Sequence, residues 1–304
     1  MSAGAPPPSA IDPLGDVAVA VGPPRDDASM ARRERVRVLL HSKSFIAGAI
    51  IVGFFVLCAI IGRAVVLQDP FDSNPLNQLE GPNADNWFGT DRLGRDVFSR
   101  VIVGARDIML IAPAATLLGT VLGTALGLIT GYFRGTVDDV LSRIIEAVLA
   151  LPVVLVGILA LTSLGPSNVT IVLVVGFVFA PVIARTVRAA VLSERELEYV
   201  SAARLRNEKT PYILFAEILP NVMGPVVVEF TVRLGYAIFV VATLSFLGLG
   251  VQPPSPDWGL QVFEHYGLIS GGFWWPVLFP AAAIAILVIG VNLIADGLTQ
   301  AFER

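Results

Sequence analysis

Apolar residues along this chain gather in long runs separated by short charged segments. The first run lies between Lys43 and Arg63 and holds nineteen uncharged residues, about the length that a helix needs to span a hydrocarbon core. Further apolar stretches cover residues 108–133, 147–184, 223–250 and 265–295. The 147–184 stretch is long enough for two helices, and Leu164-Gly165-Pro166-Ser167-Asn168 divides it. The pattern predicts an all-α integral membrane protein with six transmembrane helices.

Composition supports this prediction. Of the 304 residues, 55% are hydrophobic and only 15% are charged, whereas a soluble domain carries about a quarter charged residues. The first 30 residues are different, because they contain six prolines and no apolar block. We therefore expect residues 1–30 to form a disordered tail.

Positive charge predicts the orientation of the spans. Five basic residues precede the first span: Arg32, Arg33, Arg35, Arg37 and Lys43. Such residues stay in the cytoplasm, so six spans place both termini there, together with residues 134–144, 185–221 and 299–304. The 63–106 loop carries five arginines on the other side and disagrees. A long loop weighs less in this rule, and the orientation is kept.

The sequence lacks the residue patterns that common catalytic sites need. A phosphate-binding P-loop needs Gly-Lys-Ser/Thr, but the only lysines, Lys43 and Lys209, follow Ser42 and Glu208. The two histidines, His41 and His265, fall on opposite sides of the predicted membrane, which excludes a Ser-His pair or a His-based metal site within one chain. We expect no catalytic residues, no metal site and no resident cofactor.

Small residues in the second span predict close helix packing. Gly119, Gly123, Gly127 and Gly131 recur every four residues and therefore share one helical face. Two prolines, Pro152 and Pro181, each remove a backbone hydrogen bond from an expected span and should kink it. Such kinks suit the gating of a pathway and equally suit static bends.

Two charged residues enter the fifth span. Glu229 and Arg233 lie one turn apart, so each can neutralise the other and lower the cost of entering the bilayer. The sharper alternative is that they line a polar translocation path, because ionisable groups at membrane depth usually face protein or water.

The charged segment 198–221 predicts a helix-turn-helix at the membrane surface. Residues 194–206 are rich in good helix formers and end at Asn207, Thr210 and Pro211. A second helix is expected from Tyr212 to Leu219, ending at Pro220-Asn221. A loop with this much structure should contact a partner.

This segment resembles the EAA loop of ABC importer permeases, which docks into a groove of the ATPase subunit. The resemblance rests on Tyr199-Val200-Ser201-Ala202-Ala203-Arg204, on Asn207 and on Ile218-Leu219-Pro220-Asn221. Ser201 replaces the family's Glu, and Asn207 replaces a Gly that Asn can substitute because it tolerates a left-handed backbone. Glu217 stands where the family often has His. The resemblance implies coupling-loop roles for Glu198, Tyr199, Ser201, Ala202, Ala203, Arg204, Asn207, Leu219 and Pro220.

Two further stretches are similar to signatures of the dipeptide and oligopeptide permeases of the DppC/OppC type. They are Gly89-Thr90-Asp91-Arg92-Leu93-Gly94-Arg95-Asp96 and Ser245-Phe246-Leu247-Gly248-Leu249-Gly250, the latter followed by Asp257-Trp258-Gly259. In the first stretch, Asp91, Arg95 and Asp96 can cross-link an extracytoplasmic loop through charge-assisted hydrogen bonds. We predict this structural role in preference to substrate contact.

The resemblance implies a MetI-like ABC permease fold in a bacterial inner membrane. The parts are a cytoplasmic tail at 1–30, a first transmembrane helix with its extracytoplasmic loop at 31–106, and a core permease domain at 107–304 that includes the coupling loop 194–221. The implied partners are a sister permease of the DppB/OppB type, two ATPase subunits of the DppD/DppF type and an extracytoplasmic substrate-binding protein. ATP and magnesium would bind to the ATPases, and no nucleic acid is implied.

Several alternatives stay open. Nickel and glutathione importers share the same signatures as peptide importers. A secondary transporter would need acidic residues at mid-membrane, and the candidates Glu146, Glu229 and Asp296 all lie near predicted cytoplasmic ends. A membrane enzyme would need a nucleophile, base or metal constellation that the sequence does not offer.

Overall fold

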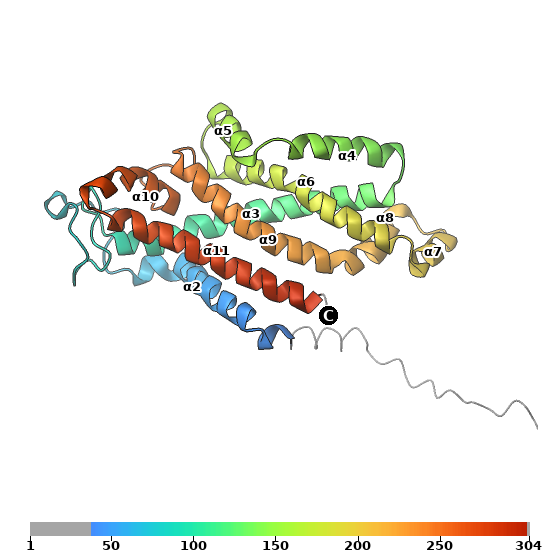
Figure 1. Ribbon diagram of the computed structural model, residues 1–304, viewed down its shortest axis with the longest axis horizontal. Helices are drawn as coiled ribbons and strands as arrows, with labels where there is room; N and C mark the ends of the chain where they lie inside the picture. Colours follow the sequence, from blue (N-terminus) through green and yellow to red (C-terminus); the bar gives the residue numbers. More distant parts are fainter. Residues whose placement is uncertain (1–37, 303–304) are drawn as a thin grey trace, which may run out of the picture.

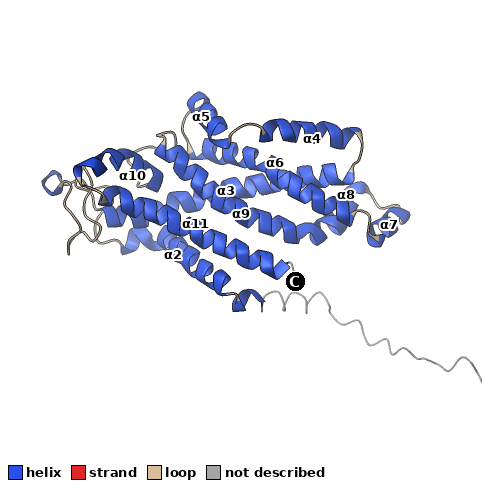
Figure 2. Cartoon of the chain, viewed as in Figure 1, coloured by secondary structure: helices blue, strands red, loops and turns tan. Residues whose placement is uncertain are grey.

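The computed structural model describes residues 38–302, and within them the backbone is helical with no β-strand (Figure 2). An isolated bridge joins Thr90 and Asp96. The all-α prediction is confirmed for this part of the chain. The expected tail at 1–30 and the arginines at 32–37 lie outside the described residues.

Five long helices form the body of the molecule and run side by side along its long axis (Figure 1). They are α2 (Lys43–Val65), α3 (Val97–Tyr132), α6 (Asn168–Glu194), α9 (Leu219–Phe246) and α11 (Trp275–Phe302). Each is long and apolar enough to cross a membrane, and α9 does so together with the helical segment that precedes it.

The third expected span, at 147–164, is not one straight helix. The structure has α4 (Thr136–Leu149) and α5 (Val153–Leu164), which meet at an angle of 83°. Alone, α5 has 12 residues and is too short to span, so residues 38–302 hold five candidate spans, or six if this bent pair is one. Pro152 explains the break, because it lacks an N–H and disfavours helical geometry in the residue before it. The predicted kink is therefore a complete break.

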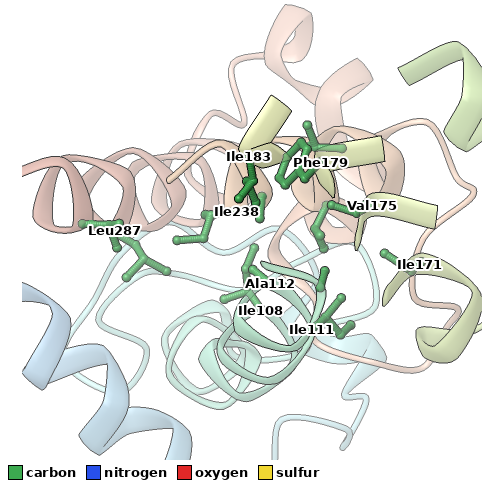
Figure 3. Close-up of a cluster of buried hydrophobic side chains, with 14 of the residues drawn as sticks. Ile108, Ile111, Ala112, Ile171, Val175, Phe179, Ile183, Ile238 and Leu287 are labelled. Carbon is green, nitrogen blue, oxygen red and sulfur yellow. The ribbon is translucent and has the colours of Figure 1, made fainter. Parts of the chain in front are cut away.

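The glycine face of α3 packs against α6, as predicted. A side-chain carbon placed at Gly123 would lie 2.6 Å from the Ala180 carbonyl oxygen, and one at Gly127 would lie 2.6 Å from the Val187 side chain. Buried side chains of α3, α6, α9 and α11 meet beside this contact in the core (Figure 3). Those labelled are Ile108, Ile111, Ala112, Ile171, Val175, Phe179, Ile183, Ile238 and Leu287. Missing side chains on α3 are thus what allow the two helices to approach.

The loop between α6 and α9 differs from its prediction at both ends. The helix expected at 194–206 is two helices, because α6 runs on to Glu194 and α7 begins only at Glu198 (Glu198–Leu205). After a turn come α8 (Thr210–Tyr212) and a π-helical segment (Ile213–Ile218), which lead without a stop into α9. Pro220 therefore does not end the second helix. It is the second residue of α9 and lies in a helical backbone that runs on from the π-helical segment.

The opposite end of the molecule holds the segment between α2 and α3 and the short helix α10 (Trp258–His265) (Figure 1). Short 3₁₀ segments occur at Pro75–Asn77 and Tyr266–Gly271. In Figure 1, α10 and α7 lie at opposite ends of the long axis. The motif at 198–221 is thus separated by the length of the bundle from the two motifs at 89–96 and 245–259.

Candidate functional site

The helix α7 has an inner and an outer face. Val200 and Ala203 are fully buried, whereas Ser201, Ala202 and Glu198 are exposed. The two alanines of the motif therefore have different environments. Ala203 packs α7 against the rest of the chain, and Ala202 belongs to the surface that α7 presents outward.

The turn after α7 is fixed by backbone geometry. Asn207 has φ = +60°, the left-handed conformation expected at this position, and its N–H donates to the Arg204 carbonyl at 2.9 Å. Arg206 forms ion pairs across the turn with Glu217 at 3.1 Å and with Glu208 at 3.6 Å. The turn is thus held by both backbone and side chains.

The base of the loop is tied to the end of α3. The Arg195 guanidinium donates to the Tyr132 carbonyl oxygen at 2.5 Å. Arg204 lies over the Tyr132 ring, 5.2 Å from its centroid. The Tyr199 hydroxyl donates to Glu194 at 2.8 Å, and burial together with this carboxylate raises the pKa of Tyr199 to about 12. Tyr199 therefore remains a neutral hydrogen-bond donor at physiological pH.

Sequence reasoning missed the apolar residues on the outside of this loop. Leu205 is 89% exposed at the end of α7, and Tyr212 and Phe215 are also exposed. The available signal was an apolar residue enclosed between Arg204 and Arg206 in an otherwise charged segment. Leu219 is half-buried and Pro220 is exposed. The loop thus presents small and apolar groups on a rigid base.

A second candidate surface runs along α9. Glu229 and Arg233 form an ion pair at 2.6 Å, and the Thr186 hydroxyl of α6 lies 3.4 Å from the Glu229 carboxylate. Arg233 also lies 5.2 Å from the Tyr236 ring centroid. The same face continues at helical spacing to Phe239, which is exposed. Charged and aromatic groups thus share one face of a candidate span.

The two prolines singled out in the sequence have unlike surroundings. Pro152 is exposed at the break between α4 and α5. Pro181 is buried within α6, which continues through it without a break. Only Pro181 lies on a helix that contributes a side chain, Thr186, to the Glu229 contact.

At the other end, the predicted loop signature forms a hydrogen-bonded turn. The Asp91 carboxylate accepts from the Arg95 side chain at 2.6 Å and from the Leu93 backbone N–H at 2.7 Å. Asp96 caps α3 by accepting from the Ser99 backbone N–H at 2.8 Å. Gly94 has φ = +73°, which a residue with a side chain would adopt only with strain.

Further contacts join this turn to distant parts of the chain. Thr90 accepts at its carbonyl from the Trp275 indole N–H at 3.0 Å, and its hydroxyl accepts from the Glu80 backbone N–H at 2.9 Å. Gly89, with φ = +72°, leaves room beside the Trp275 ring. Arg95 reaches Glu264 of α10 at 3.3 Å. These residues therefore fasten the α2–α3 segment to α10 and α11.

Two ionisable groups of α10 are buried. Asp257 caps α10 by accepting from the Leu260 N–H at 2.8 Å, and its burial raises its pKa to about 6. His265 lies 2.7 Å from the Gln261 carbonyl oxygen, and burial lowers its pKa. Within residues 38–302, no three His, Cys, Asp or Glu side chains come together as a metal site would require.

Comparison with known proteins adds the family. Residues 123–304 match the family described as "Binding-protein-dependent transport system inner membrane component". The chain is 38% identical to the dipeptide transport system permease protein DppC of Alkalihalophilus pseudofirmus, over 92% of this chain and 93% of the relative. It is 37% identical to the oligopeptide transport system permease protein OppC of Bacillus subtilis, over 86% of each chain.

A third relative has another name. The chain is 40% identical to the glutathione transport system permease protein GsiD of Salmonella paratyphi A, over 84% of this chain and 86% of the relative. The family match and these relatives agree with the helical, multi-pass architecture and confirm the predicted fold class. This chain belongs to the family of inner membrane components of binding-protein-dependent transport systems.

Proposed function

We propose that this chain is the transmembrane permease subunit of an ATP-driven importer of dipeptides and oligopeptides. The observation that carries the proposal is the exposed surface of Ser201, Ala202 and Leu205 on the rigid loop at one end of a permease-family bundle. A surface of small and apolar groups on a fixed base suits insertion into a partner's groove.

The partner at this loop is an ATPase subunit. Two such subunits bind and hydrolyse ATP with magnesium, and this chain contributes no catalytic residue of its own. The exposed loop residues Glu198, Ser201, Ala202 and Arg204 would make the contact, and Tyr199, Ala203 and Asn207 would hold its shape. A loop fixed by buried residues transmits displacement instead of absorbing it.

The helices that leave the loop carry the displacement into the membrane. α6 ends at the loop and α9 continues from it, and Thr186 of α6 meets Glu229 of α9. Movement of the loop would therefore change the position of α6 relative to α9 beside the Glu229–Arg233 pair. This is a mechanical route from ATPase closure to alternating access.

A sister permease covers the charged face of α9 in the assembled transporter. A Glu–Arg pair within a candidate span is stable beside protein or water and costly beside lipid. The translocation path would then run between the two chains, with Glu229 and Arg233 on its wall. A substrate-binding protein would deliver peptide at the opposite end, and both termini of this chain would lie in the cytoplasm of a bacterial cell.

The substrate class follows from the relatives. Two of them are named for dipeptides and oligopeptides, and GsiD is named for glutathione, itself a peptide. Glutathione import is therefore the second candidate. Competition for uptake between labelled dipeptide and unlabelled glutathione separates the two.

The test of the docking surface is an exchange of one exposed alanine. The chain is co-expressed with its sister permease and ATPases, and the complex is purified through a tag on this chain. Ala202→Glu should lose the ATPase subunits, because it places a charge on the proposed contact. Ala84→Glu, an exposed alanine between α2 and α3, should retain them. Equal retention of the ATPases by both variants would overturn the docking role.

A further inference from the structure

Two adjoining hollows lie along the contact of α2 with α3, near the α10 end. The first has a volume of about 360 Å³ and includes Arg63, Phe71 and Ser255 in its wall. The second has a volume of about 450 Å³ and is lined by Val56, Ala59, Ile60, Arg106, Met109 and Leu110. Ala59, Ile60 and Arg106 line both, so the hollows form one groove, hereafter the α2–α3 groove.

The groove is amphipathic along the bundle axis. On α2, Arg63 lies in the last turn, and Ile60 and Val56 follow one and two turns further into the span. On α3, Leu110 lies one turn further into the span than Arg106. Ile60, Val56 and Leu110 are exposed. Both helices thus place a charge at the end of the groove and apolar groups below it.

The two guanidinium groups at the charged end are available to a ligand. Within residues 38–302, neither Arg63 nor Arg106 has a carboxylate within ion-pair distance, and both are exposed. Asp107, the acid beside them, is hydrogen-bonded to the Ser255 hydroxyl. Arg63 lies over the Phe71 ring at 5.4 Å, which orients it toward the groove without neutralising it.

Two other arginines of residues 63–106 do have carboxylates nearby. Arg95 and Arg100 are buried beside Asp91 and Glu264, so their charges are compensated. The excess of positive charge that conflicts with the predicted orientation is therefore concentrated on exposed residues, two of which share the α2–α3 groove.

We propose that the α2–α3 groove binds an anionic phospholipid of the adjacent leaflet. The phosphate lies between Arg63 and Arg106, and an acyl chain follows the apolar wall past Ile60 and Leu110. A soluble anion would use only the charged end, whereas a zwitterionic lipid would gain less from an end where two guanidinium groups outweigh one carboxylate, that of Asp107. The site lies far from the coupling loop and does not depend on the transported substrate.

The test counts bound lipid on the full chain. The chain is purified from vesicles of equal phosphatidylglycerol and phosphatidylcholine with identical acyl chains, and native mass spectrometry measures what is retained. The wild type should retain phosphatidylglycerol preferentially. Arg63→Gln and Arg106→Gln should each lower this retention about fivefold, the effect of one cationic side chain near an anionic surface. Arg106→Lys, which keeps the charge, should retain most of it.

Two further variants separate the groove from general charge. Arg92→Gln removes an exposed arginine of the same segment outside the groove and should leave retention unchanged. Ile60→Trp fills the apolar part without altering charge and should reduce retention.

Four outcomes would overturn the proposal. They are equal retention of both lipids, an equal effect of Arg92→Gln, displacement of the lipid by millimolar inorganic phosphate, and loss of the lipid when the sister permease is bound. The third would indicate a soluble-anion site, and the fourth would indicate a protein contact.

Discussion

Single residues fix both ends of this molecule by satisfying backbone groups where a helix begins or ends. Asn207 closes the turn after α7 in a left-handed conformation, and Asp257 begins α10 from a fully buried position. Neither role depends on a large contact area. Asn207 tolerates a left-handed backbone, and the Asp257 carboxylate caps the first turn of α10.

Asn207 is predicted to tolerate glycine and to reject a β-branched residue. Asn207→Gly should keep the free energy of unfolding within about 0.5 kcal/mol, whereas Asn207→Val should lower it by about 1–2 kcal/mol because of the positive φ. Thermal unfolding of the purified chain measures both. Equal stability of the two variants would show that the left-handed turn is not required.

Asp257 is predicted to make stability pH-dependent. Its folded-state pKa of about 6 lies above the unfolded value of 3.8, so the unfolded chain loses its proton first as pH rises. This residue's contribution is therefore most favourable below about pH 4 and falls between pH 4 and 6, by on the order of 3 kcal/mol.

Asp257→Asn provides the measurement for this effect, because Asn also caps a helix. The variant should lose the wild-type fall in melting temperature between pH 4 and 6. If the two proteins show parallel pH profiles, Asp257 does not titrate in this range.

At the scale of elements, the contact between α3 and α6 is governed by the absence of side chains. Four of the five glycines of α3, those at 119, 123, 127 and 131, lie against α6, whose backbone and β-branched residues Ile183, Val187 and Val191 are among the groups they meet. In a membrane, lipid is as apolar as the helix surface, so close packing supplies the association energy.

Gly123→Ala should therefore destabilise the chain although alanine favours helices. Its methyl group would meet the Ala180 carbonyl and Ile183 at under 3 Å, and overpacking of this kind costs about 1–3 kcal/mol. Gly53→Ala on α2 is the matched control, because no other group approaches that position within 4 Å. Chemical denaturation in detergent compares them, and an equal effect at both sites would contradict the packing argument.

At the scale of the whole molecule, two ends with different structures are joined by continuous helices. The α10 end is fastened by buried ion pairs, and the α7 end presents an exposed loop. The Glu229–Arg233 pair lies on α9, which is continuous with that loop. Movement of the loop would therefore reach the charged pair through α9.

Reversal of this pair tests whether mutual pairing is its main requirement. Glu229→Gln leaves Arg233 without its partner and should reduce peptide uptake by about tenfold or more, since an unpaired charge within a span is costly. The double exchange of Glu229→Arg with Arg233→Glu restores the pair and should recover most of the uptake. Uptake into proteoliposomes containing the complete transporter is the measurement. No recovery would assign the individual charges a direct role toward substrate.

The helical class, the approximate spans and the packing face of α3 could be predicted from the sequence, because each follows from local apolar length or from a four-residue spacing. The sequence also indicated the left-handed turn at Asn207, since the residue type limits φ locally. It placed Pro220 at a helix end and gave Pro152 only a kink. The structure differs at both positions, because the effect of a proline depends on whether the turns around it accommodate its missing N–H. The π-helical segment before α9 does so for Pro220.

Contacts within the folded chain also determine which residues of the 194–221 loop face outward. Ala202 and Ala203 are adjacent and chemically identical, yet one is exposed and the other is buried. The same holds for Arg63 and Arg106, which come together from different helices, and for Arg95 and Arg100, which find carboxylates in α10 and in the preceding turn. Such outcomes depend on contacts between segments distant in the chain, and local pattern carries no information about them.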